Sequence, residues 1–145
     1  MRGCEFKVEL TYMVTSKRQK NVLVVCDELS ELKVISSLME KVDFRVLTVP
    51  TRATSVEEFA RRGEPIDLAI IDVGNVPAHD PRILHSLHES YPKVRLVFLS
   101  SDSEGRGSEI GPAGHVRGYL RKPVRKAQLL GTILTVMDAP AMFAA

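Results

Sequence analysis

Four side chains that can carry chemistry each stand at the end of a short apolar run. Asp27 follows VLVVC, Asp72 follows LAII, Ser100 follows VRLVFL, and Lys122 comes two residues after VRGYL. Carboxylate oxygens are the ligands that Mg²⁺ prefers. An ammonium and a hydroxyl group are suited to phosphate oxygens. If the four side chains converge, they predict a place to form and hold an aspartyl phosphate.

These side chains converge if the apolar runs are parallel strands of one sheet, because ligands bind beyond the carboxyl ends of such strands. Three of the runs lack a polar face, which is typical of strands covered by helices on both sides. The five runs are Val22–Cys26, Phe44–Val49, Leu68–Ile71, Val94–Leu99 and Val116–Leu120.

Helical patterns lie between these runs. Their predicted starts are Ser30 as an N-cap, Thr54 with Glu57 or Ser55 with Glu58 as a capping box, and Asp80 followed by Pro81. A last helix carries Leu129, Leu130, Ile133, Leu134 and Met137. The alternation predicts an α/β fold of the flavodoxin-like type, with a doubly wound five-stranded parallel sheet in three α/β/α layers. Four glycines and Pro112 between Ser101 and His115 predict that the fourth helix is short or irregular.

We expect one domain over residues 21–138, an N-terminal extension over residues 1–20 and a tail over residues 139–145. Alternating apolar residues from Phe6 to Val14 leave three alternatives for the extension: an edge strand, a strand that pairs with another chain, or a frayed end. No output domain is recognisable after Met137, so the chain either acts alone through partners or is a piece of a longer protein.

The composition excludes several classes of protein. The net charge of +2 argues against a general polyanion binder, and no apolar run approaches the roughly 18 residues of a membrane span. Two cysteines form neither a disulfide framework nor a zinc site, so we expect a cytoplasmic protein. A small doubly wound enzyme is disfavoured, since no nucleophile elbow, P-loop or dinucleotide fingerprint follows a strand.

The motifs VLVVCDE, IDLAIIDV, LVFLSS and GYLRKPV resemble the strand-end motifs of response regulator receiver domains, the chemotaxis-regulator-like family of two-component signalling. The resemblance covers about residues 20–138. It implies that Asp72 accepts a phosphoryl group from a histidine kinase or phosphotransfer protein. It also implies that Asp27, Asp72 and the backbone carbonyl of Gly74 bind Mg²⁺. Ser100 and Lys122 would contact the phosphoryl group.

The same resemblance implies a switch. Ser100 and Tyr119 would move on phosphorylation and alter a protein-interaction face, while the Lys122–Pro123 bond would be cis. Such a domain is not an enzyme beyond its own phosphorylation and autodephosphorylation. Its partners would be the kinase and a downstream protein or fused effector domain, and it can form a homodimer. Neither direct nucleic-acid binding nor membrane binding is expected.

Two departures from the family pattern favour an alternative. Cys26 stands where the family has the first of two acids, and a thiol is a poor ligand for Mg²⁺; Glu28, shifted in position, is a further candidate for the missing charge. In the loop after Asp72, Pro77 stands five residues on instead of four. The alternative, which the glycine-rich fourth connection also favours, is a pseudo-receiver, a protein-binding module of the same fold that acts independently of phosphorylation.

Overall fold

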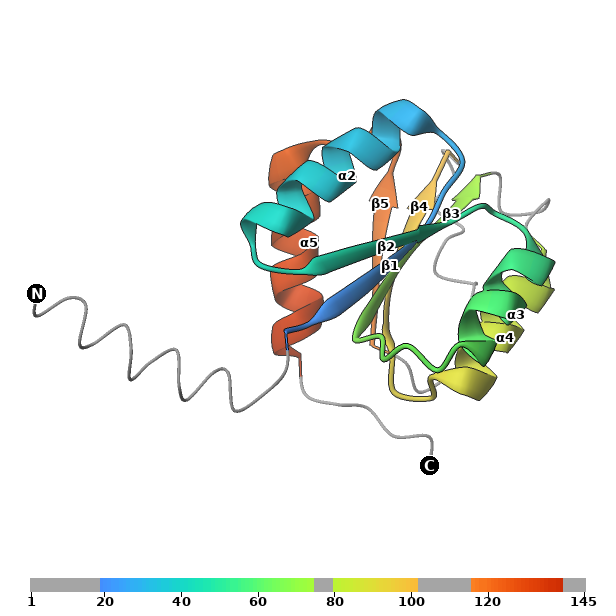
Figure 1. Ribbon diagram of the computed structural model, residues 1–145. Helices are drawn as coiled ribbons and strands as arrows, with labels where there is room; N and C mark the ends of the chain where they lie inside the picture. Colours follow the sequence, from blue (N-terminus) through green and yellow to red (C-terminus); the bar gives the residue numbers. More distant parts are fainter. Residues whose placement is uncertain (1–18, 75–79, 102–115, 140–145) are drawn as a thin grey trace, which may run out of the picture.

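A single parallel sheet forms the centre of the molecule (Figure 1). The computed structural model describes residues 19–74, 80–101 and 116–139. The five strands are β1 (Asn21–Val25), β2 (Arg45–Val49), β3 (Leu68–Gly74), β4 (Arg95–Ser100) and β5 (Arg117–Arg121). They pair in the order β2-β1-β3-β4-β5, and every pairing is parallel. The doubly wound five-stranded sheet predicted from the apolar runs is therefore confirmed.

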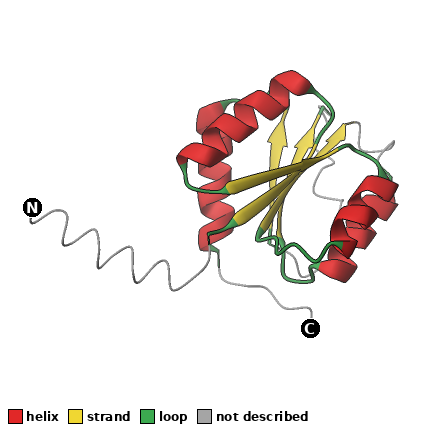
Figure 2. Cartoon of the chain, viewed as in Figure 1, coloured by secondary structure: helices red, strands yellow, loops and turns green. Residues whose placement is uncertain are grey.

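Helices cover both faces of the sheet (Figure 2). They are α2 (Leu29–Lys41), α3 (Ala53–Arg61), α4 (Pro81–Ser90) and α5 (Lys126–Asp138). Helices α2 and α5 lie on one face, and α3 and α4 lie on the other. Each face has its own apolar core, because alternate residues of a strand point to opposite sides. Val24 and Ile70 pack under α2 and α5, whereas Val25 and Ile71 pack under α3 and α4.

The three inner strands are buried almost throughout, while the edge strands β2 and β5 are half-exposed. This agrees with the three apolar runs that lack a polar face. Burial on both sides is typical of inner strands that helices cover on both faces of a parallel sheet.

Two of the predicted helix starts are wrong. Helix α2 begins at Leu29, so Ser30 lies inside it, and α3 begins at Ala53, before both proposed capping boxes. In the described structure Glu28 and Arg52 occupy the N-cap positions without a side-chain cap hydrogen bond. The connections from β1 to α2 and from β2 to α3 are short, so both helices begin before the residues that were predicted to cap them. The start of α4 is confirmed, since the Asp80 carboxylate accepts a hydrogen bond from the Arg82 N–H.

Hydrogen bonds at the amino edge of the sheet hold the two ends of the described chain. The Asn21 backbone N–H donates to Asp67 Oδ2 at 2.8 Å, and its side-chain amide donates to the Pro65 carbonyl at 2.6 Å. The Arg95 guanidinium, at the start of β4, donates to the carbonyl of Ala139, just after the last turn of α5, at 2.7 Å. The start of β1 and the end of α5 are therefore fixed at the same edge (Figure 1).

Some expectations fall on segments outside the described residues. These are the N-terminal alternation from Phe6 to Val14, the proline of the acceptor loop, the glycine-rich fourth connection and the end of the C-terminal tail. Among the described helices, none combines the length and apolarity that a membrane crossing requires.

Candidate functional site

Asp72 lies at the carboxyl end of the central strand β3, with only 9% of its surface exposed. A shift of register between Asp72 and Gly74 leaves Val73 as a bulge against β4. The bulge turns the chain so that the Gly74 N–H donates to Asp72 Oδ1 at 2.8 Å, while Gly74 has φ of +57°, a conformation suited to glycine. Lys122 Nζ lies 2.7 Å from the other oxygen, Oδ2. The Asp72 carboxylate is thus fixed by one N–H and one ammonium.

Lys122 brings together acids from three parts of the chain. It follows β5, its side chain is 14% exposed, and the Lys122–Pro123 bond is cis, as expected. Besides Asp72, its ammonium contacts Glu28 Oε1 at 2.9 Å and Glu31 Oε2 at 3.6 Å. Burial alone lowers the pKa of Lys122, but the hydrogen bonds to Asp72 and Glu28 and the charges nearby outweigh it and raise the pKa. The lysine is therefore a fixed cation.

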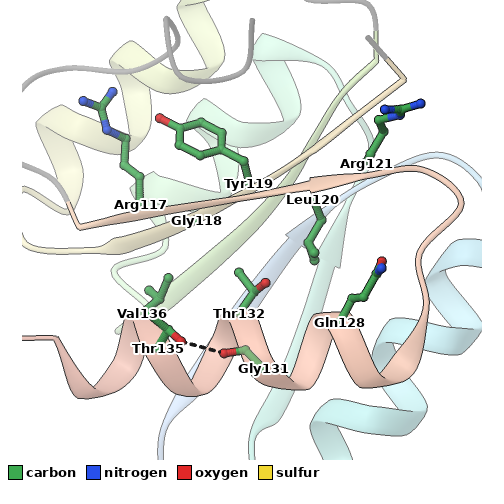
Figure 3. Close-up of a pocket in the computed structure, with 10 residues that line it drawn as sticks. All are labelled: Arg117, Gly118, Tyr119, Leu120, Arg121, Gln128, Gly131, Thr132, Thr135 and Val136. Atoms are coloured by element: carbon green, nitrogen blue, oxygen red, sulfur yellow. Dashed lines mark hydrogen bonds between the residues drawn. The ribbon is translucent and has the colours of Figure 1, made fainter. Parts of the chain in front are cut away.

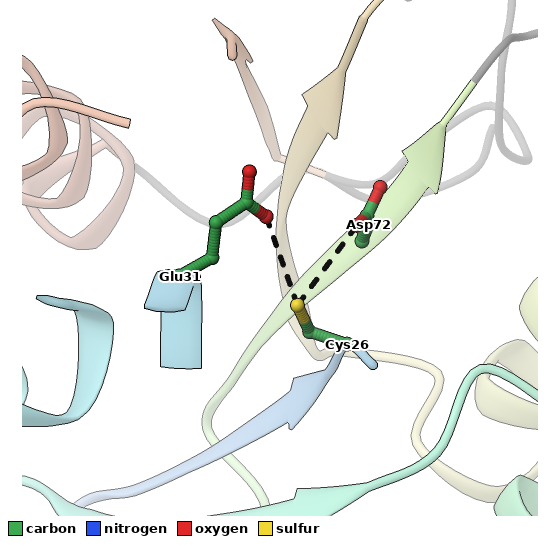
Figure 4. A group of neighbouring side chains, drawn as sticks. All are labelled: Cys26, Glu31 and Asp72. Carbon is green, nitrogen blue, oxygen red and sulfur yellow. Dashed lines mark hydrogen bonds between the residues drawn. The ribbon is translucent and has the colours of Figure 1, made fainter. Parts of the chain in front are cut away.

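Cys26 and Glu31 complete a cluster around the Asp72 carboxylate (Figure 4). Cys26 Sγ lies 3.7 Å from Glu31 Oε2 and 3.9 Å from Asp72 Oδ2. One ligand atom from each of the three residues lies within 4.8 Å of the others. Burial raises the pKa of the Cys26 thiol to about 12, and the charges of Asp72 and Glu31 add to the effect. At neutral pH the cluster therefore contains a neutral thiol beside the carboxyl groups of Glu31 and Asp72.

Asp27 is exposed and lies outside this cluster of ligand atoms. Its Oδ1 accepts a hydrogen bond from the Thr51 N–H at 2.9 Å, which ties the end of β1 to the start of the connection into α3. Asp27 Oδ2 makes no hydrogen bond or ion pair with the described residues.

Ser100 ends β4 beside the bulge and is buried. Its hydroxyl donates to the Gly74 carbonyl at 3.1 Å, and the Ser101 N–H donates to the same oxygen at 3.0 Å. The Gly74 carbonyl therefore accepts two hydrogen bonds, one from the last residue of β4 and one from the residue that follows it. This is the carbonyl that the sequence suggested as a metal ligand.

Tyr119 lies on β5 beside a groove of about 690 Å³ between β5 and α5. Tyr119 points to the same side of β5 as Arg117 and Arg121, while Leu120 points toward α5 (Figure 3). The Tyr119 ring packs against Phe98 with 5.5 Å between ring centroids, and 38% of the residue is exposed. The Tyr119 side chain is therefore only partly enclosed by the protein.

The structure brings Asp72 and Lys122 into contact. It places Ser100 on β4, the strand next to the one that carries Asp72. Glu31 is the residue that sequence reasoning missed, because an acid in the first turn of a helix normally only stabilises that helix. Its signal was its position, one turn along α2 from Glu28, in a chain with no acid at residue 26.

The three residues of the cluster, Cys26, Glu31 and Asp72, are only partly suited to binding a hard divalent cation. Asp72 and Glu31 offer carboxylate oxygens close to one another, which suits Mg²⁺. Cys26 offers a protonated sulfur, which does not. Two carboxylates with several waters are an ordinary ligand set for Mg²⁺.

No protein-family model matches the chain. A comparison with curated proteins finds sensor kinase CckA of Brucella abortus (strain 2308), which is 27% identical over 97 residues. That match covers 65% of this chain and 10% of the kinase. The chain thus aligns with about a tenth of the length of the curated relative it matches.

Solved structures resemble the chain over most of its length. The receiver domain of a sensor histidine kinase from Pseudomonas aeruginosa PAO1, with magnesium coordinated in its active-site cleft, is 20% identical with a TM-score of 0.65, covering 83% of this chain and 99% of that one. Chemotaxis protein CheY4 of Vibrio cholerae is 23% identical with a TM-score of 0.67, covering 81% and 98%.

A response regulator receiver domain protein from Clostridium thermocellum is 25% identical with a TM-score of 0.60, covering 82% of this chain and 94% of that one. These structures share the sheet flanked by helices on both faces. The chain therefore has the fold of response regulator receiver domains of the CheY-like class.

Proposed function

We propose that this domain is a receiver of two-component signalling that accepts a phosphoryl group on Asp72. One observation carries the proposal: in a receiver fold, Lys122 Nζ lies 2.7 Å from a buried carboxylate at the carboxyl end of the central strand. A buried aspartate held by a fixed cation at this edge is an oriented nucleophile. The donor would be a phosphohistidine of a histidine kinase or phosphotransfer protein.

The transfer balances as a simple displacement. An oxygen of the Asp72 carboxylate attacks phosphorus, the phosphorus–nitrogen bond of the phosphohistidine breaks, and the imidazole leaves with the electron pair and takes up a proton. Lys122 then pairs with the new phosphoryl oxygens, and the Ser100 hydroxyl can leave the Gly74 carbonyl to donate to them. This chain would catalyse no reaction beyond its own phosphorylation and dephosphorylation.

Magnesium is the proposed cofactor, with Asp72, Asp27 and the Gly74 carbonyl as candidate ligands. When bound, the cation would neutralise charge on the phosphoryl oxygens. Asp27 has its second carboxylate oxygen for this role, whereas the Gly74 carbonyl would first have to release a hydrogen bond from β4.

The proposed output is a change at the face around Tyr119. If Ser100 moves toward the phosphoryl group, the space beside it favours an inward Tyr119 rotamer, which shifts a two-state equilibrium. The side of β5 that carries Arg117, Tyr119 and Arg121 (Figure 3) would then change shape for a downstream protein or a second copy of the domain. A cytoplasmic location belongs to this proposal, since the buried thiol of Cys26 remains reduced there.

The decisive experiment is phosphorylation by acetyl phosphate with Mg²⁺, followed by intact-mass spectrometry. The wild-type domain should gain the mass of one phosphoryl group, and Asp72→Asn should gain none. Beryllium fluoride with Mg²⁺ should perturb the amide spectrum of the wild type but not of Asp72→Asn. Equal labelling of the two proteins would remove Asp72 from the role.

A second candidate function is a pseudo-receiver that binds a protein partner independently of phosphate. The neutral thiol of Cys26 favours it, because it removes a charge from the cation site. In that case, the wild type would show neither labelling nor spectral change at millimolar Mg²⁺.

A further inference from the structure

Glu31 is buried in a way that its helix does not explain. Only 11% of its side chain is exposed, and Figure 4 shows it pointing from the start of α2 toward Asp72. A first-turn acid stabilises a helix from an exposed position, without the cost of leaving water. Removing a carboxylate from water is costly unless hydrogen bonds or a cation compensate.

That compensation is incomplete in the described structure. Lys122 Nζ lies 3.6 Å from Glu31, longer than its contacts of 2.7 Å to Asp72 and 2.9 Å to Glu28. The other partner is the weakly donating thiol of Cys26 at 3.7 Å. Among the described residues, no backbone N–H donates to the Glu31 carboxylate. One ammonium thus contacts three carboxylates, so the cluster has an excess of negative charge that a further cation would balance.

We propose that Glu31 supplies the divalent cation with the carboxylate that residue 26 lacks, so that α2 as well as the strand ends holds the metal. The inference rests on the proposed function, because the cation is the magnesium of that site. The glutamate side chain reaches from the helix to within 3.7 Å of Cys26 Sγ, so its carboxylate lies next to the position where a carboxylate at residue 26 would stand. The thiol of Cys26 is then a small neutral spacer between the two carboxylates.

The test measures Mg²⁺ binding by calorimetry and Mn²⁺ binding by electron paramagnetic resonance, with no phosphoryl donor present. Glu31→Gln should weaken both affinities by at least about tenfold, since removing a group that only orients a metal ligand already costs that much. Glu40→Gln, which removes the same charge from an exposed position of α2, should leave both unchanged. Circular dichroism verifies that each variant is folded.

A swap makes the result independent of any effect on folding. In Cys26→Asp with Glu31→Gln, the carboxylate moves from α2 to the end of β1, and affinity should return to within a few-fold of the wild type. The assignment would be overturned if the double variant did not regain affinity, or if Glu31→Gln bound the metals as tightly as the wild type. It would also be overturned if Glu28→Gln weakened metal binding and Glu31→Gln did not. So would a wild type that binds no divalent cation at tens of millimolar.

Failure of the inference and failure of the proposed function give different results. Asp72 labelling together with unchanged metal affinity in Glu31→Gln would remove only the role of Glu31. Weakened metal binding in Glu31→Gln together with no labelling of Asp72 would remove only the phosphorylation proposal.

Discussion

Lys122 is the residue on which the charges of the site depend. Its ammonium contacts one carboxylate from β3, one from α2 and one from the turn between β1 and α2. The cluster remains negative even so, because three carboxylates surround one ammonium. The neutral Cys26 thiol limits that excess, since a carboxylate in its place would add another charge.

The Cys26 thiol should be nearly inert in the folded protein. A pKa raised from 9.0 to about 12 reduces the thiolate fraction at pH 8 roughly a thousandfold, and burial blocks access as well. A disulfide reagent applied to Cys4→Ser, which leaves one thiol to count, should react slowly until guanidinium unfolds the chain. Rapid native labelling would contradict the raised pKa.

Glu31 should make stability depend on pH. Burial raises its pKa above the usual range, and Glu28 and Asp72 add to this while Lys122 opposes it. Folding then favours the protonated acid. Its contribution to stability is complete below the unfolded-state pKa of about 4.3 and is lost as pH rises through the higher folded-state value.

The measurement compares urea unfolding of the wild type and Glu31→Gln in the presence of a chelator. The free energy of unfolding of the wild type minus that of Glu31→Gln should fall from pH 4 to pH 7. A difference that rises with pH would mean that the folded state favours the charged acid.

At the scale of elements, α5 packs on β5 at a distance that only glycine permits. A Cβ atom on Gly118 would lie 2.6 Å from Thr132 Cγ2 and 2.9 Å from Val136 Cγ2. This close approach sets the position of β5 and therefore of Tyr119 and Lys122, which belong to or follow that strand.

Gly118→Ala should destabilise the domain by about 1–3 kcal/mol, the usual cost of overpacking. Gly131→Ala is the matched control, since its new Cβ meets nothing within 4 Å, and it should stabilise α5 by up to about 1 kcal/mol. Thermal unfolding of both variants measures the contrast. Similar effects at both positions would show that α5 does not pack this closely.

For the whole molecule, the fold was more predictable than the site. The apolar runs located the strand ends, and hence Asp72 and Lys122, because burial on both faces leaves a clear pattern. The starts of α2 and α3 were misplaced because short connections, and not capping residues, determine them. Glu31 was missed because its burial results from the packing of α2 over the sheet, which no local pattern records.

Lys122 also contributes to the stability of the whole domain. Lys122→Met leaves the Asp72 and Glu31 carboxylates buried without their cation, which should cost about 3 kcal/mol at pH 7. Lys126→Met, an exposed control on α5, should change the free energy of unfolding by less than about 0.5 kcal/mol. Urea titration distinguishes the two, and equal small effects would mean that the site tolerates unpaired acids.

The hydrogen bonds at the amino edge of the sheet determine where a tether can be attached to the domain. Asn21 and Arg95 hold the start of β1 and the end of α5 at the edge of the sheet opposite Asp72. A surface anchor, fluorophore or fused module joined at residue 19 or 139 would therefore sit away from the carboxyl edge of the sheet. Under the proposed function, the domain can be immobilised through either position while a phosphoryl donor still reaches Asp72.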